Sequence, residues 1–254
     1  MKEETIGSRL VRRGLDKYKA APYFVEFTGN AEADELINDL QKYPHAFVMA
    51  CVANHQIKGK LDWTVPFRLS QRMSHFDFNH LCALTLKDVE TLTKKPEPLE
   101  GFTSEVCEIL YRAVCHISSR YEGDAARIWS DRPPSGELVY RFLEFRGMGP
   151  KLANRAANIL ARQFRIPLSD YYSIDISPEG PVKRVFTRLG LVPKDSPTEH
   201  FIFKARSLHP EFPGVLNLPG WEIGSSWCKL RNPSCQECYM NDLCPSASIE
   251  DTDT

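Results

Sequence analysis

Four cysteines near the C-terminal end of the sequence constrain this chain more than any other feature. They follow one another in the pattern C-x6-C-x2-C-x5-C, as Cys228, Cys235, Cys238 and Cys244. Thiolates this close together can surround one metal centre, either a structural zinc ion or a four-iron cluster. Zinc ribbons usually present two separate C-x2-C pairs, and this stretch has one. The spacing therefore favours a four-iron cluster over zinc, and both over four free thiols, which would be open to oxidation.

The chain has eight cysteines in all, and the other four are scattered. We expect Cys51, Cys82, Cys107 and Cys115 to be small buried residues on helix faces. The charged start of the sequence lacks the apolar stretch of an export signal, so a disulfide framework is not expected. No apolar run reaches the roughly 20 residues of a membrane span. These features predict a soluble intracellular protein, cytoplasmic or nucleoid-associated, or nuclear in a eukaryote.

Apolar residues recur at three- and four-residue spacing over much of the chain, which predicts an all-α fold. Of the 254 residues, 42% are apolar, enough to build a substantial core. Helices are expected over 105–117, 149–164 and 181–189, a long connection over 165–178, and a frayed polar tail over 245–254. The apolar stripe of the first of these helices consists of Val106, Ile109, Leu110, Ala113, Val114 and Ile117.

A second motif, Gly147-Met-Gly149-Pro-Lys151, lies between two of the expected helices. Two glycines around one apolar residue allow a tight turn with outward N–H groups at the start of a helix, where the helix dipole favours anions. Such a turn can bind phosphate. The formal net charge is only -1, but residues 141–165 contain six basic residues, Arg146 among them, and one acid. This local charge of +5 predicts a salt-sensitive nucleic-acid surface.

The glycine hairpin followed by the cysteine pattern resembles the endonuclease III family, DNA glycosylases of the helix-hairpin-helix (HhH-GPD) superfamily. The resemblance implies a six-helix lobe over 31–160 that contains the hairpin. It also implies a second lobe, formed by 1–30 and 161–244, that holds a 4Fe–4S cluster, with DNA and the active site in the cleft between the lobes. In this arrangement Lys229 and Arg231, between the first two cysteines, can reach phosphates, and the alternative is that they are ordinary solvated charges.

The resemblance also implies site residues. Lys151 stands where the bifunctional members carry the amine that forms a Schiff base, although a lysine there can also bind phosphate. For the catalytic carboxylate the sequence departs from the family. The family carries its Asp directly after an apolar residue, and this pattern selects Asp175, which we prefer. Counting back from the Arg-Leu-Gly-Leu sequence at 188–191 selects Glu179 instead. Either carboxylate can also be a simple helix cap. Gln56 matches the residue that fills the space of the flipped base, and the alternative is that it belongs to an ordinary polar surface loop.

We therefore expect a base-excision DNA glycosylase that acts, as a monomer, on double-stranded DNA containing a damaged or mismatched, flipped-out base. Abasic-site lyase activity is expected if Lys151 is the amine. The runner-up is a non-catalytic DNA-binding protein that keeps the hairpin and the cluster but has lost the acid. A third interpretation is a zinc-stapled helical interaction module.

Overall fold

The regular structure of the computed structural model is helical, and none of the residues that it describes forms a strand. The all-α prediction is confirmed. No described helix is long and apolar enough to cross a membrane. The described residues are 4–20, 24–54 and 63–247.

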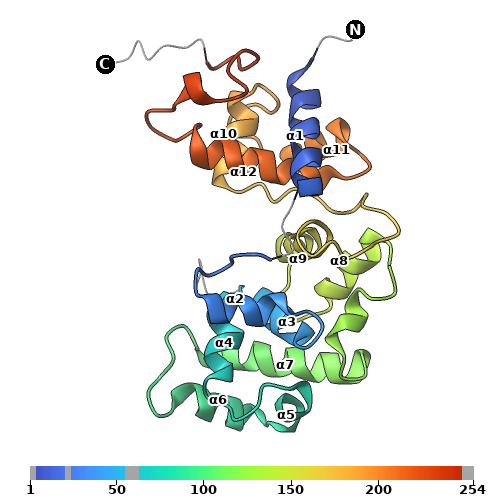
Figure 1. Cartoon of the computed structure of the whole chain (residues 1–254), viewed down its shortest axis with the longest axis vertical. Helices are drawn as coiled ribbons and strands as arrows, with labels where there is room; N and C mark the ends of the chain where they lie inside the picture. Colours follow the sequence, from blue (N-terminus) through green and yellow to red (C-terminus); the bar gives the residue numbers. More distant parts are fainter. Residues whose placement is uncertain (1–3, 21–23, 55–62, 248–254) are drawn as a thin grey trace. The chain divides into compact units, whose positions relative to one another are not determined.

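The chain divides into two compact units, one made of 1–21 with 170–254 and the other of 22–169 (Figure 1). These divisions lie nine residues from each of the expected lobe boundaries at 30 and 160. We call the first the cysteine unit and the second the hairpin unit, and describe each by itself.

A fully buried helix, α3, forms the centre of the hairpin unit. All ten residues of Pro44–Ala53 are buried, because nine of them are apolar and lie on every side of the helix. The one polar side chain, His45, has its Nε2 atom 3.0 Å from the carbonyl oxygen of Phe76. It packs against α2, α4, α7 and α9. The helices of this unit are α2 (Ala31–Asn38), α3, α4 (Val65–Ser70), α5 (Phe78–Ala83), α6 (Leu86–Lys94), α7 (Ser104–Arg120), α8 (Ser135–Leu143) and α9 (Pro150–Arg162), with a 3-10 turn at η2 (Ala125–Ile128).

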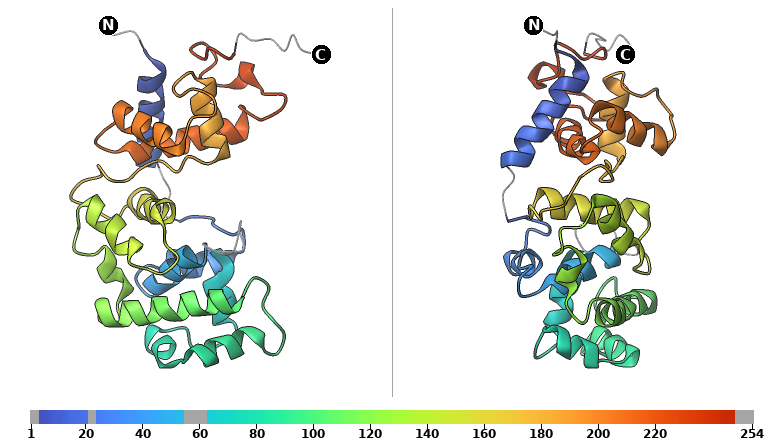
Figure 2. Two further views of the ribbon diagram at one scale, coloured as in Figure 1. Left: turned by 180° about the vertical axis from the view of Figure 1, so that it is seen from behind. Right: turned by 90° about the vertical axis from the view of Figure 1, so that its right-hand side faces the viewer.

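The helix expected over 105–117 is α7, which begins after a Thr103 cap and extends to Arg120. The hydroxyl of Thr103 accepts a hydrogen bond from the N–H of Val106, as an N-cap should. All six residues of the expected apolar stripe are buried, and this face meets α3, α5 and α6 (Figures 1 and 2). The prediction for this helix is confirmed.

The cysteine unit is built around the pair α10 and α12. The helix expected over 181–189 is α10, which spans Gly180–Arg188. The N-terminal helix α1 (Ile6–Ala20) packs against α12 (Asn217–Ser226) and the 3-10 turn η3 (Pro213–Leu216). The remaining elements are α11 (Thr198–Leu208) and η4 (Cys235–Glu237).

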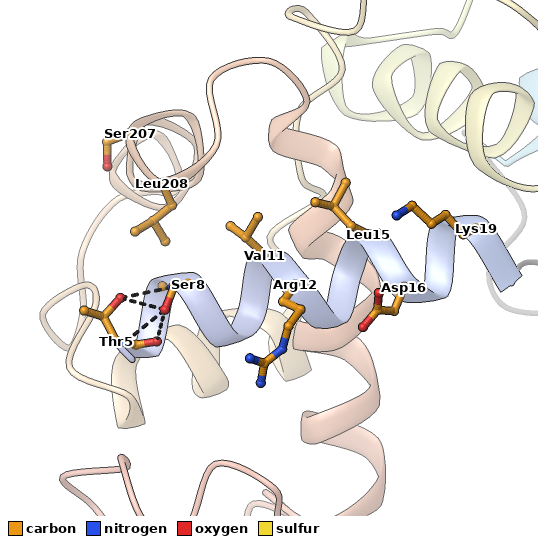
Figure 3. A pocket seen from close by; sticks show the side chains of 10 residues that line it. Thr5, Ser8, Val11, Arg12, Leu15, Asp16, Lys19, Ser207 and Leu208 are labelled. Carbon is orange, nitrogen blue, oxygen red and sulfur yellow. Dashed lines mark hydrogen bonds between the residues drawn. The ribbon is translucent and has the colours of Figure 1, made fainter. Parts of the chain in front are cut away.

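Two glycines let α1 approach its neighbours closely. A Cβ atom on Gly14 would lie 2.4 Å from the carbonyl oxygen of Val215 in η3, and one on Gly7 would lie 2.6 Å from the Leu208 side chain of α11. Val11 and Leu15 of this helix, with Leu208 of α11, line an open groove of about 590 Å³ (Figure 3). None of the expected site residues lines this groove.

The prediction for the four scattered cysteines is half right. Cys51 and Cys107 are buried, whereas Cys82 and Cys115 are exposed. Cys115 directly follows a residue of the buried stripe of α7, so it lies about 100° around the helix from that stripe. Cys82 belongs to the six-residue helix α5, in which only Leu81 is buried.

Candidate functional site

The glycine motif forms the turn between α8 and α9, two helices that pack against each other. Gly147 has φ 88°, a left-handed conformation that side chains rarely adopt. Met148 is buried, so its side chain anchors the turn to the core of the hairpin unit. The chain then enters α9 through Gly149, the N-cap, and Pro150, whose missing N–H costs nothing at the first helical position.

Gly149 has a different environment from Gly147. Its backbone is extended, with φ -85° and ψ 174°, which any residue can adopt. A Cβ atom placed on it would meet no heavy atom within 4 Å, so the protein leaves open space there. Lys151 lies in the first turn of α9 and is exposed. The arrangement joins an open backbone position, a helix N-terminus and a lysine amine, which suits an anionic ligand.

The local positive charge of this region is smaller than the sequence suggests. The guanidinium of Arg141 forms hydrogen bonds with Asp131 at 2.8 Å, which raise the pKa of Arg141, and with Glu137 at 2.9 Å. Arg146, expected to bind DNA, donates to Glu108 at 2.6 Å. All three acids lie outside the 141–165 window, so a count within that window missed them.

The loop with the expected base-replacing residue, Gln56, lies outside the described residues, which resume at Trp63. The Trp63 side chain is 4% exposed and stacks on Phe27, with ring centroids 4.2 Å apart. The Arg155 guanidinium carbon lies 5.5 Å from the centre of the indole ring. Trp63 is therefore a packing residue of the hairpin unit.

The first candidate carboxylate, Asp175, is buried and held by an arginine. Both of its oxygens accept hydrogen bonds from Arg206 of α11 at 2.7 Å, a bidentate pair. Hydrogen bonding to Asp175 raises the pKa of Arg206. Nothing in the sequence marks Arg206 as the partner of an aspartate 31 residues earlier.

The second candidate, Glu179, is exposed and is the N-cap residue of α10, although its side chain makes no capping hydrogen bond. The next residue, Gly180, also leaves open space, since a Cβ there would meet no heavy atom within 4 Å. A carboxylate at this position faces the positive end of the helix dipole. The two candidates thus differ in environment, one buried in an ion pair and one exposed beside an open helix start.

The four clustered cysteines line one cavity of the cysteine unit. Burial raises the pKa of Cys238 and of Cys244. No three His, Cys, Asp or Glu side chains in the described part of the chain are grouped as ligands of a single metal ion. Four thiols around one cavity are a donor set that either a zinc ion or a 4Fe–4S cluster can take. The apolar wall consists of Val185, Leu189, Ile223, Trp227, Met240 and Ala247.

Two arginines of α10 hold the segment that follows the first cysteine. Arg184 donates to the carbonyl of Cys228 at 2.6 Å, and Arg188 donates to the carbonyl of Lys229 at 2.7 Å. These bonds leave the side chains of Lys229 and Arg231 exposed. The sequence alone did not show that these two arginines bind the cysteine loop, because the spacing of residues along a helix does not reveal which loop lies beside that helix.

No protein-family model matches the sequence, and no curated relative matches it. Solved structures do resemble it. One is a trapped endonuclease III–DNA covalent intermediate, an estranged-adenine complex, with a TM-score of 0.57 and 18% identity over 94% of each chain. Another is a non-covalent endonuclease III–DNA complex, with a TM-score of 0.56 and 18% identity over 96% of this chain and 97% of that one. The chain therefore has the endonuclease III fold.

Proposed function

We propose that this protein is a base-excision DNA glycosylase that removes a damaged or mismatched base flipped out of double-stranded DNA. The observation that carries the proposal is Lys151, an exposed amine in the first turn of α9, beside the open position at Gly149. Similarity to two endonuclease III–DNA complexes along almost the whole chain supports it. In this proposal the N–H groups around Gly147 and Gly149 bind a DNA phosphate. Arg146 releases Glu108 and binds a phosphate of the DNA backbone instead.

The amine can perform both steps of the reaction. Its lone pair attacks C1′ of the deoxyribose, the C1′–N bond breaks, and the departing base takes the electron pair and a proton from water. The ammonium so formed gives a proton to the hydroxide left by that water, its nitrogen lone pair then expels O4′, which takes up a proton, and a protonated Schiff base remains. A nearby carboxylate stabilises the cationic sugar while the base leaves. The lyase activity proposed for Lys151 proceeds from this Schiff base.

We assign the carboxylate to Glu179 and treat Asp175 as the alternative. Asp175 already has both oxygens engaged by Arg206 at 2.7 Å, and its side chain is 9% exposed. A buried carboxylate whose charge is offset by a guanidinium on both oxygens stabilises a sugar cation weakly. Glu179 is exposed beside the open space at Gly180.

The cysteine cavity supports a resident 4Fe–4S cluster with Cys228, Cys235, Cys238 and Cys244 as ligands. When bound, the cluster supplies four metal–thiolate bonds that fix the fold of this segment. Lys229 and Arg231 are then carried on an ordered loop and contact DNA phosphates.

Borohydride trapping tests the proposal. Wild-type protein is incubated with a duplex carrying an abasic site and reduced, and we expect a covalent adduct that disappears in Lys151→Ala. Lys87→Ala, an exposed lysine of α6, is the matched control and should trap as well as wild type.

Base release is measured in parallel on duplexes with uracil, oxidised pyrimidine, mispaired thymine and alkylated purine. Release of one of these bases supports the glycosylase. Tight binding without release or adduct would overturn it in favour of the non-catalytic DNA-binding protein.

A further inference from the structure

The stretch that leads to Glu179 has no regular structure of its own. Residues 174–179, here called the carboxylate segment, run without helix or strand into the N-cap of α10. Within it, the N–H of Glu179 donates to the carbonyl of Ser177 at 2.8 Å. A segment of this kind keeps one conformation only when other parts of the protein bind its backbone.

Those contacts come from one short stretch of the same unit. The N–H of Gly214 donates to the carbonyl of Ile174 at 2.7 Å, and the N–H of Ser177 donates to Oδ1 of Asn217 at 2.8 Å. Gly214 lies in η3, and Asn217 is the first residue of α12. Arg206 holds the side chain of Asp175 between these two points. The segment is therefore fixed at three of its first four residues.

The stretch that provides these contacts is itself supported from behind. η3 packs against α1, where Gly14 approaches the carbonyl of Val215 so closely that a Cβ would lie 2.4 Å from it. All four residues of η3 are buried. Movement of η3 toward α1 is blocked by backbone atoms, so Gly214 and Asn217 act as a rigid support.

We infer that Asn217 is a positioning residue for Glu179, acting through the N–H of Ser177. The inference rests on the proposed function of Glu179 as the carboxylate. The N–H of Ser177 donates to Asn217, and the carbonyl of Ser177 accepts from the N–H of Glu179. The amide of Asn217 therefore fixes the position of Ser177, and through it the position of Glu179 at the start of α10. Asn217 itself touches no substrate in this scheme.

Three variants separate this role from a general effect on folding. Asn217→Leu keeps the size of the side chain and removes the acceptor, whereas Asn217→Asp keeps an acceptor oxygen. Ser177→Ala removes a buried hydroxyl that has no hydrogen-bond partner among the described residues, and leaves the N–H in place. Each variant is measured by thermal unfolding, by hydrogen exchange of fragments covering 174–180, and by single-turnover base release with the DNA dissociation constant.

In Asn217→Leu we expect exchange in 174–180 to rise about five- to tenfold, because one backbone hydrogen bond is lost. Base release should slow about ten- to a hundredfold with an unchanged dissociation constant, because a displaced catalytic group loses rate and not binding. Asn217→Asp should restore both, and Ser177→Ala should exchange like wild type.

Unchanged exchange in Asn217→Leu would overturn the inference whether or not the protein releases a base. Faster exchange with an unchanged rate of base release would overturn the positioning role as well. If wild type releases no base from any duplex, the proposed function fails, and the exchange data still decide whether Asn217 orders the segment.

Discussion

Gly147 and Gly149 flank the same methionine but are required for different reasons. Gly147 adopts φ 88°, so a side chain there strains the backbone, while Gly149 has an ordinary φ of -85° and open space beside it. Gly149→Ala should therefore leave the unfolding temperature unchanged and weaken binding of duplex DNA about tenfold, because the methyl group occupies the approach to the helix N-terminus. Gly147→Ala should lower the free energy of unfolding by about 1 kcal/mol. Thermal unfolding and fluorescence anisotropy check both, and wild-type affinity in Gly149→Ala would contradict the phosphate site.

The two candidate carboxylates should separate stability from catalysis. Asp175→Asn breaks a bidentate ion pair whose arginine side chain is 41% exposed, so we expect a loss of about 1–3 kcal/mol in the free energy of unfolding. Glu179→Gln, at an exposed position, should change stability by less than about 0.5 kcal/mol and slow base release at least about a hundredfold. Chemical denaturation and single-turnover kinetics are applied to both variants. An Asp175→Asn protein that is as stable as wild type but inactive would return the catalytic role to Asp175.

Sequence reasoning could name both carboxylates but could not decide between them. Relative to the family pattern, the chain has four extra residues between Asp175 and α10. Which carboxylate takes the catalytic position depends on where the chain loops these residues out, and tertiary contacts determine that. Arg206, Asn217 and Gly214 supply those contacts from other elements, and no local spacing points to them. Lys151, by contrast, is the last residue of a turn motif that spans only 147–151. Its place in the first turn of α9 could therefore be predicted from neighbouring residues alone.

At the scale of helices, α1 offers a matched pair of substitutions. Replacing a helical glycine by alanine normally stabilises by about 1 kcal/mol. At Gly14 the added Cβ meets a backbone carbonyl at 2.4 Å, whereas at Gly7 it meets the end of a leucine side chain at 2.6 Å. We expect Gly14→Ala to lower the free energy of unfolding by about 2–3 kcal/mol and Gly7→Ala to cost less than about 1 kcal/mol. Denaturant titration measures both, and equal stabilities would contradict the close packing of α1 on η3.

The helices themselves were largely predictable, because local periodicity determines them. The stripe of α7 can be predicted from its own residues, and so can the limits of α10, which has Pro181 in its first turn and ends before Gly190. Exposure of a single residue on a helix was harder to predict, as Cys82 and Cys115 show, because it depends on which neighbour covers that face.

For the whole molecule, neither the formal charge of -1 nor the local count of +5 shows which basic side chains are available to the proposed DNA ligand. Arg141 forms ion pairs with two acids inside the hairpin unit, so it should release few counterions on DNA binding. Each phosphate contact contributes about 0.9 to the slope of the logarithm of the DNA-binding constant against the logarithm of the salt concentration.

The double variant Lys229→Ala with Arg231→Ala should therefore reduce the magnitude of this slope by about 1.8. The control Arg141→Ala should leave the slope unchanged and reduce stability. Anisotropy titrations over a range of salt concentrations measure it, and an unchanged slope in the double variant would remove the cysteine loop from the DNA surface.

The division into two units predicts that loss of the proposed cluster has a local effect. The cysteines belong to the unit made of 1–21 and 170–254, and the hairpin unit has its own core around α3. We expect purified protein to be brown, with about four irons per chain. Cys238→Ser should lose the colour and increase hydrogen exchange within 170–247, while exchange within 63–169 stays as in wild type. A colourless wild-type protein with one zinc per chain would support the zinc module instead. Increased exchange in both ranges would mean that the cluster stabilises the whole chain, because the two cores would then unfold as one cooperative unit.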